Sequence, residues 1–384
     1  MRHSRWCGIA IVSTWLFVHT VSGAQSNVAS LRADEWPKLL RKAQNGDHKA
    51  QVRVALAFKN GEVVKHDSFE ARRWFLKAAE AGDPIAENNL GVMSYAGVGT
   101  DRSATEALKW FEKAATAGIV EAKFNAARMY ETGDEVPQNL GRALNLYTQA
   151  AEEGFAPANI NLGQMYENGE GIPRNPKAAM KWYRKSAERG SPIAEFNIGS
   201  MYWHGVGVRQ DYAEAAKWFT LAAEQGDAKA QLAVSDLYRL GWGVPKNERT
   251  AVQWLRKAAE QGDAGAELTL GILYLRGQGV AQDDSIAAAW LSKAAEQGDR
   301  DAQANLAYLY ETGRGVPLDL HHAYLWRLLS LDTSTPQNDE KLRNLASQLS
   351  EADIAEAEHR VSEWRLAHVT HPAEIQDLSP DPMQ

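Results

Sequence analysis

The sequence contains a single cysteine, Cys7, among its 384 residues. One cysteine excludes an intramolecular disulfide framework and any site that needs several thiolate ligands. Runs of lysine and arginine are absent as well, and the net charge is −7 at pH 7. The chain therefore lacks the clustered positive charge that nucleic acid or an anionic membrane attracts. Because disulfides are excluded, we expect packing alone to stabilise its fold.

Sequence motifs of catalysis are also missing. The chain has no HExxH, no Walker loop, no G-x-S-x-G and no G-x-G-x-x-G between a strand and a helix. Its ten histidines are scattered: His321 and His322 are adjacent, His204 stands alone beside Trp203, and His359 lies near the C-terminus. The sequence thus predicts no catalytic centre, no cofactor and no metal site.

A long hydrophobic run occurs near the N-terminus. Arg2 and Arg5 precede the apolar stretch Trp6–Val21, and the small residues Ser22–Ala24 follow it. This pattern is typical of a cleavable secretory signal, here residues 1–24. The alternative is an uncleaved membrane anchor, but the stretch is short and polar for a membrane span. We expect a periplasmic or secreted protein with no stable membrane insertion after cleavage.

The most informative feature present is a period of 36 residues. Eight glycines follow this period: Gly46, Gly82, Gly118, Gly154, Gly190, Gly226, Gly262 and Gly298. A tryptophan recurs in the same register, with Leu146 as the one substitution: Trp74, Trp110, Trp182, Trp218, Trp254, Trp290 and Trp326. A unit that recurs eight times predicts a solenoid, in which each copy packs on its sequence neighbours.

Each unit is predicted to be an antiparallel helix pair. Ala86, Leu90 and Met93 recur at helical spacing and predict an amphipathic helix over 84–95, which Gly97 ends. A second helix follows a capping side chain, which in other units is Asp67, Asn139, Asn175, Asp211, Asn247, Asp283 or Asp319. We expect its indole, Trp110 here, to fill the gap between helices, so that truncation costs roughly 3–5 kcal/mol.

Three stretches carry a family resemblance: AENNLGVMSYAGVGTDRSATEALKWFEKAATAG, AEFNIGSMYWHGVGVRQDYAEAAKWFTLAAEQG and AELTLGILYLRGQGVAQDDSIAAAWLSKAAEQG. They resemble the Sel1-like repeat family, with its Leu-Gly pair, GxGV loop, Trp and Ala-Ala pair. Tetratricopeptide repeats have a period of 34 and lack that loop. The resemblance implies a right-handed superhelical all-α solenoid of eight 36-residue helix pairs. It also implies roles in envelope assembly, exopolysaccharide secretion, signalling to membrane sensors or host interaction.

Both ends of the array, which spans 46–331, are predicted to be covered. Residues 25–45 contain a short helix whose Trp36, Leu39 and Leu40 can cover the first repeat. At the other end, 332–370 predicts two capping helices, one from Thr335 and Pro336 to Leu349 and one opened by a capping box of Ser350 and Asp353. Residues 371–384, rich in proline, are predicted to be a mobile tail.

Candidate binding residues come from positions that recur beside the apolar stripe of the first helices. An asparagine column (Asn89, Asn125, Asn161, Asn197, Asn305) is expected to line a concave groove, where primary amides could bind a peptide backbone. Alternatively, each amide bonds to the neighbouring helix and fixes the curvature. Positions three residues further along vary and could encode specificity: Arg128, Gln164, Ser200, Asp236, Ile272 and Tyr308. Trp203 and His204 form an aromatic polar patch that could bind a partner or serve only in packing.

Together these observations predict a non-enzymatic scaffold or adaptor of the cell envelope that binds a partner protein or peptide. The alternative is an envelope hydrolase or a glycan-binding protein. Its candidate residues would be Trp203, His204 and the carboxylate pair Asp283 and Asp284, although that pair occupies the capping position of its repeat.

Overall fold

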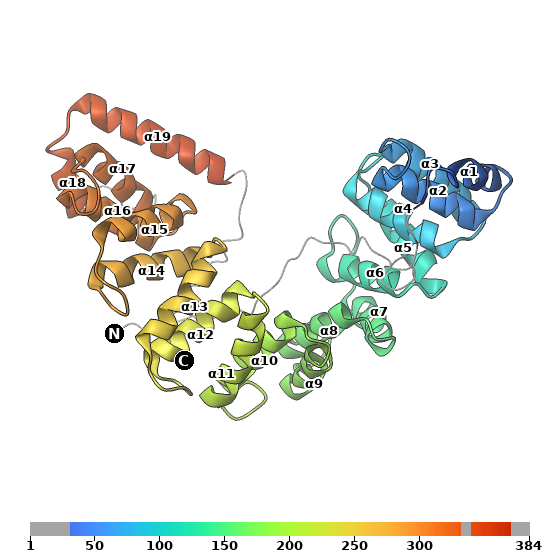
Figure 1. The fold of residues 1–384 in the computed structure, drawn as a ribbon, viewed down its shortest axis with the longest axis horizontal. Helices are drawn as coiled ribbons and strands as arrows, with labels where there is room; N and C mark the ends of the chain where they lie inside the picture. The colour runs from blue at the N-terminus through green and yellow to red at the C-terminus, as the bar shows by residue number, and fades with distance from the viewer. Residues whose placement is uncertain (1–30, 332–338, 370–384) are drawn as a thin grey trace. The chain divides into compact units, whose positions relative to one another are not determined.

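The computed structural model describes residues 31–331 and 339–369, and every regular element within them is an α-helix (Figure 1). After α1 (Trp36–Gln44), the helices alternate in pairs. The first helices of the pairs, called A helices here, are α2 (His48–Asn60), α4 (Pro84–Ala96), α6 (Val120–Thr132), α8 (Ala156–Asn168), α10 (Pro192–His204), α12 (Ala228–Leu240), α14 (Ala264–Arg276) and α16 (Arg300–Thr312). The second, or B, helices are α3 (Ser68–Glu80), α5 (Ala104–Thr116), α7 (Leu140–Glu152), α9 (Pro176–Ala187), α11 (Tyr212–Glu224), α13 (Glu248–Glu260), α15 (Asp284–Glu296) and α17 (Leu320–Ser330).

The helices form two compact units that divide between Ala194 and Glu195. Within each unit, an A helix packs against the B helix of its own pair and against the B helix of the preceding pair, as α4 does with α5 and α3. The predicted all-α solenoid of neighbouring helix pairs is therefore confirmed. Its right-handed sense and its concave groove stay predictions.

The boundaries of the helices follow from caps that the sequence contains. Asp67 accepts hydrogen bonds from the backbone N–H groups of Phe69 and Glu70, both at 3.0 Å, and the other predicted capping residues act in the same way. A helices end at a glycine in the left-handed region, such as Gly97 with φ 68°. At the next loop glycine, Gly99, a Cβ would lie 2.4 Å from the carbonyl oxygen of Ser68, so the loop packs directly on the preceding B helix.

The tryptophan column is not the deepest part of the core. Trp74 is buried, but the other six indoles are half-buried. Five of the seven are covered by a lysine three residues later, for example Lys185 with its Nζ 4.1 Å from the ring centroid of Trp182. The fully packed side chain is that of the next residue along. Seven of these residues are at most 3% exposed: Phe75, Phe111, Tyr147, Tyr183, Phe219, Leu255 and Leu291. The indoles thus fill the space between helices only in part, and the residue that follows lies deeper in the core.

A small residue on the A helix makes room for this buried side chain. At Gly163 a Cβ would lie 2.2 Å from the ring of Tyr183, and at Gly91 it would lie 2.6 Å from the ring of Phe111. The same position is also glycine at Gly199 and Gly271, and it is Ala or Ser in the other repeats. The glycine of the Leu-Gly pair therefore allows a side chain of the B helix to pack directly against the A-helix backbone.

The A helices are also more deeply buried than a single apolar stripe predicts. α4 buries the polar residues Glu87, Asn88 and Asn89 together with its apolar ones. A column of polar residues near the start of each A helix is at most 8% exposed: Gln51, Glu87, Lys123, Asn159, Glu195, Gln231, Glu267 and Gln303. Several of them bond to the end of the preceding B helix, as Gln231 Nε2 does to the carbonyl oxygen of Ala223 at 3.1 Å. Polar contacts therefore join successive repeats beneath the surface.

Helices outside the pairs cover both ends of the described array. In α1, Trp36 packs edge-on against Phe58 of α2, with ring centroids 5.8 Å apart. At the other end, α18 (Glu340–Ala346) and α19 (Glu351–Val369) pack against α17. The predicted capping box is confirmed, because Ser350 N bonds to Asp353 Oδ2 and Asp353 N bonds to Ser350 Oγ, each at 3.2 Å.

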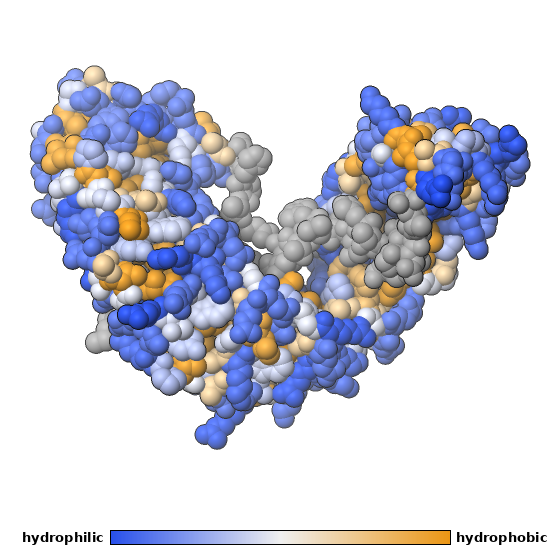
Figure 2. Space-filling model, in the orientation of Figure 1, coloured by the Kyte–Doolittle hydropathy of each residue, from blue (hydrophilic) through white to orange (hydrophobic). Residues whose placement is uncertain are grey.

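Several predicted segments lie outside the described residues. These are the signal 1–24, the start of the C-terminal helix at Thr335 and Pro336, and the tail 371–384; within the described part, α18 begins after Asp339, which caps it. No described helix has the length and apolar character that crossing a membrane would require. The face of the molecule seen in Figure 2 is mostly hydrophilic, with hydrophobic residues scattered between.

The different burial of adjacent aromatic residues leads to a stability prediction. We expect Phe111→Ala to destabilise the fold by roughly 3–5 kcal/mol, the range for a fully buried aromatic side chain. Trp110→Ala should cost less, because its indole is partly solvated already. Thermal unfolding of the two variants by circular dichroism compares them directly. An equal or larger loss for Trp110→Ala would contradict this assignment of the core.

Candidate functional site

The predicted asparagine column lies mainly inside the protein. Asn89, Asn125 and Asn197 are at most 4% exposed, whereas Asn161 and Asn305 are half-buried. Asn89 Nδ2 donates to the carbonyl oxygen of Ile85 at 2.8 Å. These amides therefore do not form one continuous exposed row, and a role in binding stays a prediction.

One member of the column belongs to a buried polar cluster that joins three helices. Asn161 Nδ2 of α8 donates to Tyr147 Oη of α7 at 2.8 Å, and Tyr147 Oη donates to Glu131 Oε2 of α6 at 2.5 Å. Burial raises the pKa of Glu131 and the pKa of Tyr147 above their ordinary values. The Asn161 amide therefore bonds to a neighbouring helix, as the alternative interpretation of the asparagine column expects.

The variable positions of the A helices are distributed unevenly between core and surface. Tyr308 is 42% exposed, and Arg128 and Gln164 are half-buried. Asp236 is only 6% exposed and is paired with Arg239 at 2.6 Å between Oδ1 and Nη2. Of these residues, Tyr308 is the one whose side chain the structure leaves open to a partner.

Trp203 belongs to an aromatic cluster larger than the sequence indicated. Its ring centroid lies 5.3 Å from that of Tyr212 and 5.2 Å from that of Trp242, and these two rings stack on each other at 5.2 Å. His204 is the last residue of α10 and is exposed. Partial desolvation of its imidazole by the surrounding residues lowers its pKa. The cluster joins the end of α10 and the start of α11 to the loop that follows α12, so contacts within the protein occupy its rings.

The carboxylates of the hydrolase alternative are already engaged. Asp283 Oδ1 accepts the backbone N–H groups of Ser285 and Ile286 as the cap of α15. Asp284 forms a bidentate ion pair with Arg314, with both distances 3.0 Å, and this pair lowers the pKa of Asp284. The two carboxylates thus stabilise the start of a helix and the contact to the following loop.

One group of residues requires a correction to the prediction that histidines do not cluster. Asp319, His321 and His322 each place one atom able to bind a metal within 4.8 Å of the others. Asp319 Oδ1 accepts the backbone N–H of His322 at 3.0 Å, and Asp319 Oδ2 lies 2.8 Å from His322 Nδ1. Oδ1 therefore caps α17, and Oδ2 is already paired with the side chain of His322.

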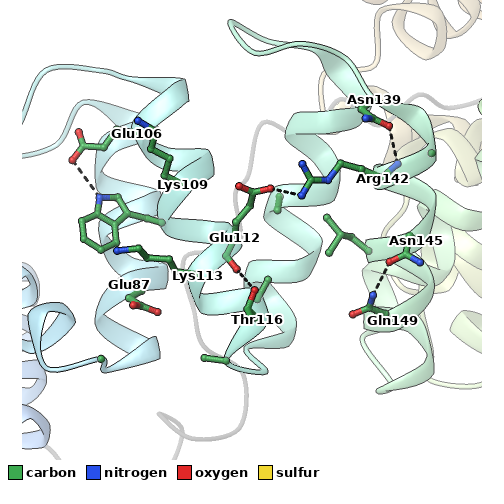
Figure 3. A pocket seen from close by; sticks show the side chains of 17 residues that line it. Glu87, Glu106, Lys109, Glu112, Lys113, Thr116, Asn139, Arg142, Asn145 and Gln149 are labelled. Carbon is green, nitrogen blue, oxygen red and sulfur yellow. Dashed lines mark hydrogen bonds and ion pairs between the residues drawn. The ribbon is translucent and has the colours of Figure 1, made fainter.

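A pocket of about 1380 Å³ lies beside α5 and α7. Figure 3 shows Lys109 and Glu112 on one wall and Asn145 and Gln149 on the other. Arg142 spans the two helices through an ion pair with Glu112, with Nη2 and Oε1 2.8 Å apart. The pocket thus combines an apolar floor with charged and amide groups at its rim. The sequence signal that could have found it is Leu146, the departure from the tryptophan column, which lines it.

A second feature that sequence reasoning missed is an exposed column on the B helices. The second residue of each B helix from α3 to α15 is exposed and differs in every repeat: Phe69, Thr105, Gly141, Lys177, Ala213, Arg249 and Ser285. Two residues later stands an alanine that is at most 1% exposed in the same seven helices: Ala71, Ala107, Ala143, Ala179, Ala215, Ala251 and Ala287. Comparison of variable and constant positions along the period could have revealed this surface.

The Sel1 repeat family model matches eight segments: 48–83, 84–119, 120–155, 156–191, 192–227, 228–263, 264–299 and 300–326. The chain belongs to the Sel1 repeat family. No curated protein matches it. Sel1 repeat arrays generally act as protein-interaction scaffolds and are typically not enzymes.

Two solved structures illustrate the similarity. A Sel1 repeat protein from Oxalobacter formigenes has 32% sequence identity and a TM-score of 0.68, over 83% of this chain and 91% of that one. A protective antigen with an SLR fold from uropathogenic Escherichia coli, c5321, has 29% identity and a TM-score of 0.48, over 92% of this chain and 91% of that one.

The buried cluster around Glu131 predicts a pH dependence of stability. A carboxyl group whose folded-state pKa is raised stabilises the fold below its unfolded pKa, about 4.3, and this contribution is lost as pH rises through the folded pKa. Glu131→Gln cannot titrate, so its stability relative to wild type should increase as pH rises from about 4 to 7.

Melting temperatures of wild type and Glu131→Gln across this range provide the measurement. Glu80→Gln, which changes an exposed carboxylate of α3, is the matched control. A stability difference for Glu131→Gln that does not change with pH would argue against a raised pKa at this site.

Proposed function

We propose that this protein is an exported, non-enzymatic scaffold of the cell envelope that binds a partner protein or peptide on the surface of its helical array. The general role of Sel1 repeat arrays supports the binding function. The exported location is supported by the signal pattern in residues 1–24.

The observation that carries the proposal is the contrast between two columns of the B helices. Ala107 and its equivalents are buried and identical, because close packing against the A helix leaves no room for variation. Thr105 and its equivalents, two residues earlier, are exposed and all different. Residues that recur therefore build the frame, while residues that vary are presented to solvent, as recognition of a specific partner requires.

The frame is also suited to binding because it is already ordered. The B helices begin at capping side chains, and polar side chains such as Gln231 join successive repeats. A rigid receptor loses little conformational entropy when a partner binds, so more of the contact energy contributes to affinity.

Export leads to the first test. Residues 1–30 placed ahead of a reporter enzyme that is active only outside the cytoplasm should give activity, and the exported full chain should begin at Gln25 by mass spectrometry. Leu16→Arg interrupts the apolar stretch and should abolish reporter activity. Reporter activity that persists with Leu16→Arg, or a chain that keeps residues 1–24 in the membrane fraction, would contradict export by cleavage.

Capture of a partner is the second test. The chain from Gln25 onward, immobilised and exposed to envelope extract, should retain the same protein reproducibly, and the purified pair should bind with a measurable dissociation constant. Exchange of exposed Lys177 and Arg249 to Glu tests the variable column, because both lie outside the core. Turnover of a cell-wall substrate with no reproducible protein partner would contradict the scaffold function.

A further inference from the structure

The third repeat, residues 120–155, lacks the indole that the other seven repeats contain. Leu146 stands where the others have tryptophan, and Gln149 stands where five of them have the lysine that covers the indole. The indole and its cover are therefore both absent from one repeat. The pocket of about 1380 Å³ lies at this same repeat.

The other repeats show where the missing indole would lie. Trp110 packs on a core cluster that contains Ala78 and Ala79 at the end of the preceding B helix. Trp182 packs in the same way on the cluster of Ala150 and Ala151. In each case the indole packs on the core cluster that contains the Ala-Ala pair of the previous repeat.

At the third repeat this place is filled only in part. Leu146 packs on the cluster of Ala114 and Ala115, and Ala115 and Leu146 both line the pocket. Gly141, which also lines it, contributes no side chain. The pocket thus opens over the apolar surface that an indole covers elsewhere, and its volume has room for a ring together with neighbouring backbone.

The rim offers groups that suit a peptide. Arg142 bridges to Glu112, which also accepts a hydrogen bond from Tyr130 Oη at 2.5 Å. Gln149 Nε2 donates to Asn145 Oδ1 at 2.7 Å, as Figure 3 shows. Primary amides can both donate to and accept from a peptide backbone. An apolar floor with a few polar groups around it is the usual composition of a binding pocket.

We infer, on the basis of the protein-binding function proposed above, that the pocket between α5 and α7 binds one aromatic side chain of a partner protein. The partner's ring would take the position that the repeat's own indole takes elsewhere, against Ala115 and beside Trp110. Aromatic anchors inserted into a pocket commonly dominate protein interfaces, which favours this occupant over a flat polar contact.

The test uses N-acetyl-L-tryptophanamide as a probe of the pocket on the full chain. We expect saturable binding by NMR, with a dissociation constant on the order of 1 mM for so small a ligand. Leu146→Trp restores the repeat's own indole and should abolish this binding; Leu146→Phe, a smaller filling, should weaken it. Leu221→Trp, which adds the same residue at an exposed site of α11, is the matched control and should leave it unchanged.

The same substitutions should also create an equivalent pocket at another repeat. The double variant Trp182→Leu/Lys185→Gln removes the indole and its lysine from the next repeat and should create an additional site for the probe. Equal binding of N-acetyl-L-leucinamide, or probe binding that survives Leu146→Trp in a folded protein, would overturn the inference. Folding is checked by circular dichroism in every variant.

Results with the captured partner separate this inference from the proposed function. Leu146→Trp should weaken binding of the partner by roughly 30-fold, which is the loss of affinity expected when an anchor cannot enter its pocket. Partner binding unaffected by Leu146→Trp would reject the aromatic pocket while leaving the scaffold function intact. Probe binding at the pocket without any protein partner would reject the scaffold function and leave the pocket standing.

Discussion

The contact on which this fold depends is the one between a bulky B-helix side chain and a small residue of the A helix. Where Tyr183 lies against Gly163, a Cβ on the glycine would come within 2.2 Å of the ring, so the two helices approach as closely as the ring permits. Each A helix also contacts the preceding B helix within its unit. Separating the A helix from either of the two B helices would expose apolar area. The repeats therefore stabilise one another rather than fold singly.

This close packing has a consequence for polar groups. A helices enclosed on two sides carry buried polar residues, and such groups cost free energy unless they are hydrogen-bonded. Gln51, Gln231 and Gln303 each donate to a carbonyl oxygen near the end of the preceding helix, where the last carbonyls have no partner within their own helix. The amide N–H groups of these side chains therefore bond to the end of the previous helix. The register between repeats is fixed by direction-dependent bonds as well as by apolar contact.

Most of the fold could be predicted from the sequence because its strongest signals concern the conformation of the backbone. Glycines that need positive φ and side chains that cap helices, such as Asp67, act locally, so their spacing alone located the helix ends. Burial was harder to predict. A tryptophan such as Trp182 has an apolar body that a lysine stem can cover at the surface, so its recurrence did not reveal that Tyr183 lies deeper. The exposure of the asparagines was predicted wrongly for a related reason. Periodicity places Asn125 beside the apolar stripe, but only the packing of the preceding B helix decides that its side chain is enclosed.

Repeat architecture also explains how a pocket can arise without loss of the fold. In a single globular core, replacing an indole by leucine leaves a cavity whose cost the whole domain bears. In an array, stability is close to a sum of repeat and interface terms, so the deficit at Leu146 is confined to one interface. The ring of Tyr147, which is fully buried, still holds that helix pair together. The half-buried indole is thus the part of a repeat that can be removed while the core contact persists, and its removal uncovers apolar surface between two charged rims. A ligand that covers this surface regains the burial that the repeat gave up. An interrupted repeat therefore suits specific binding better than any position where all eight repeats agree.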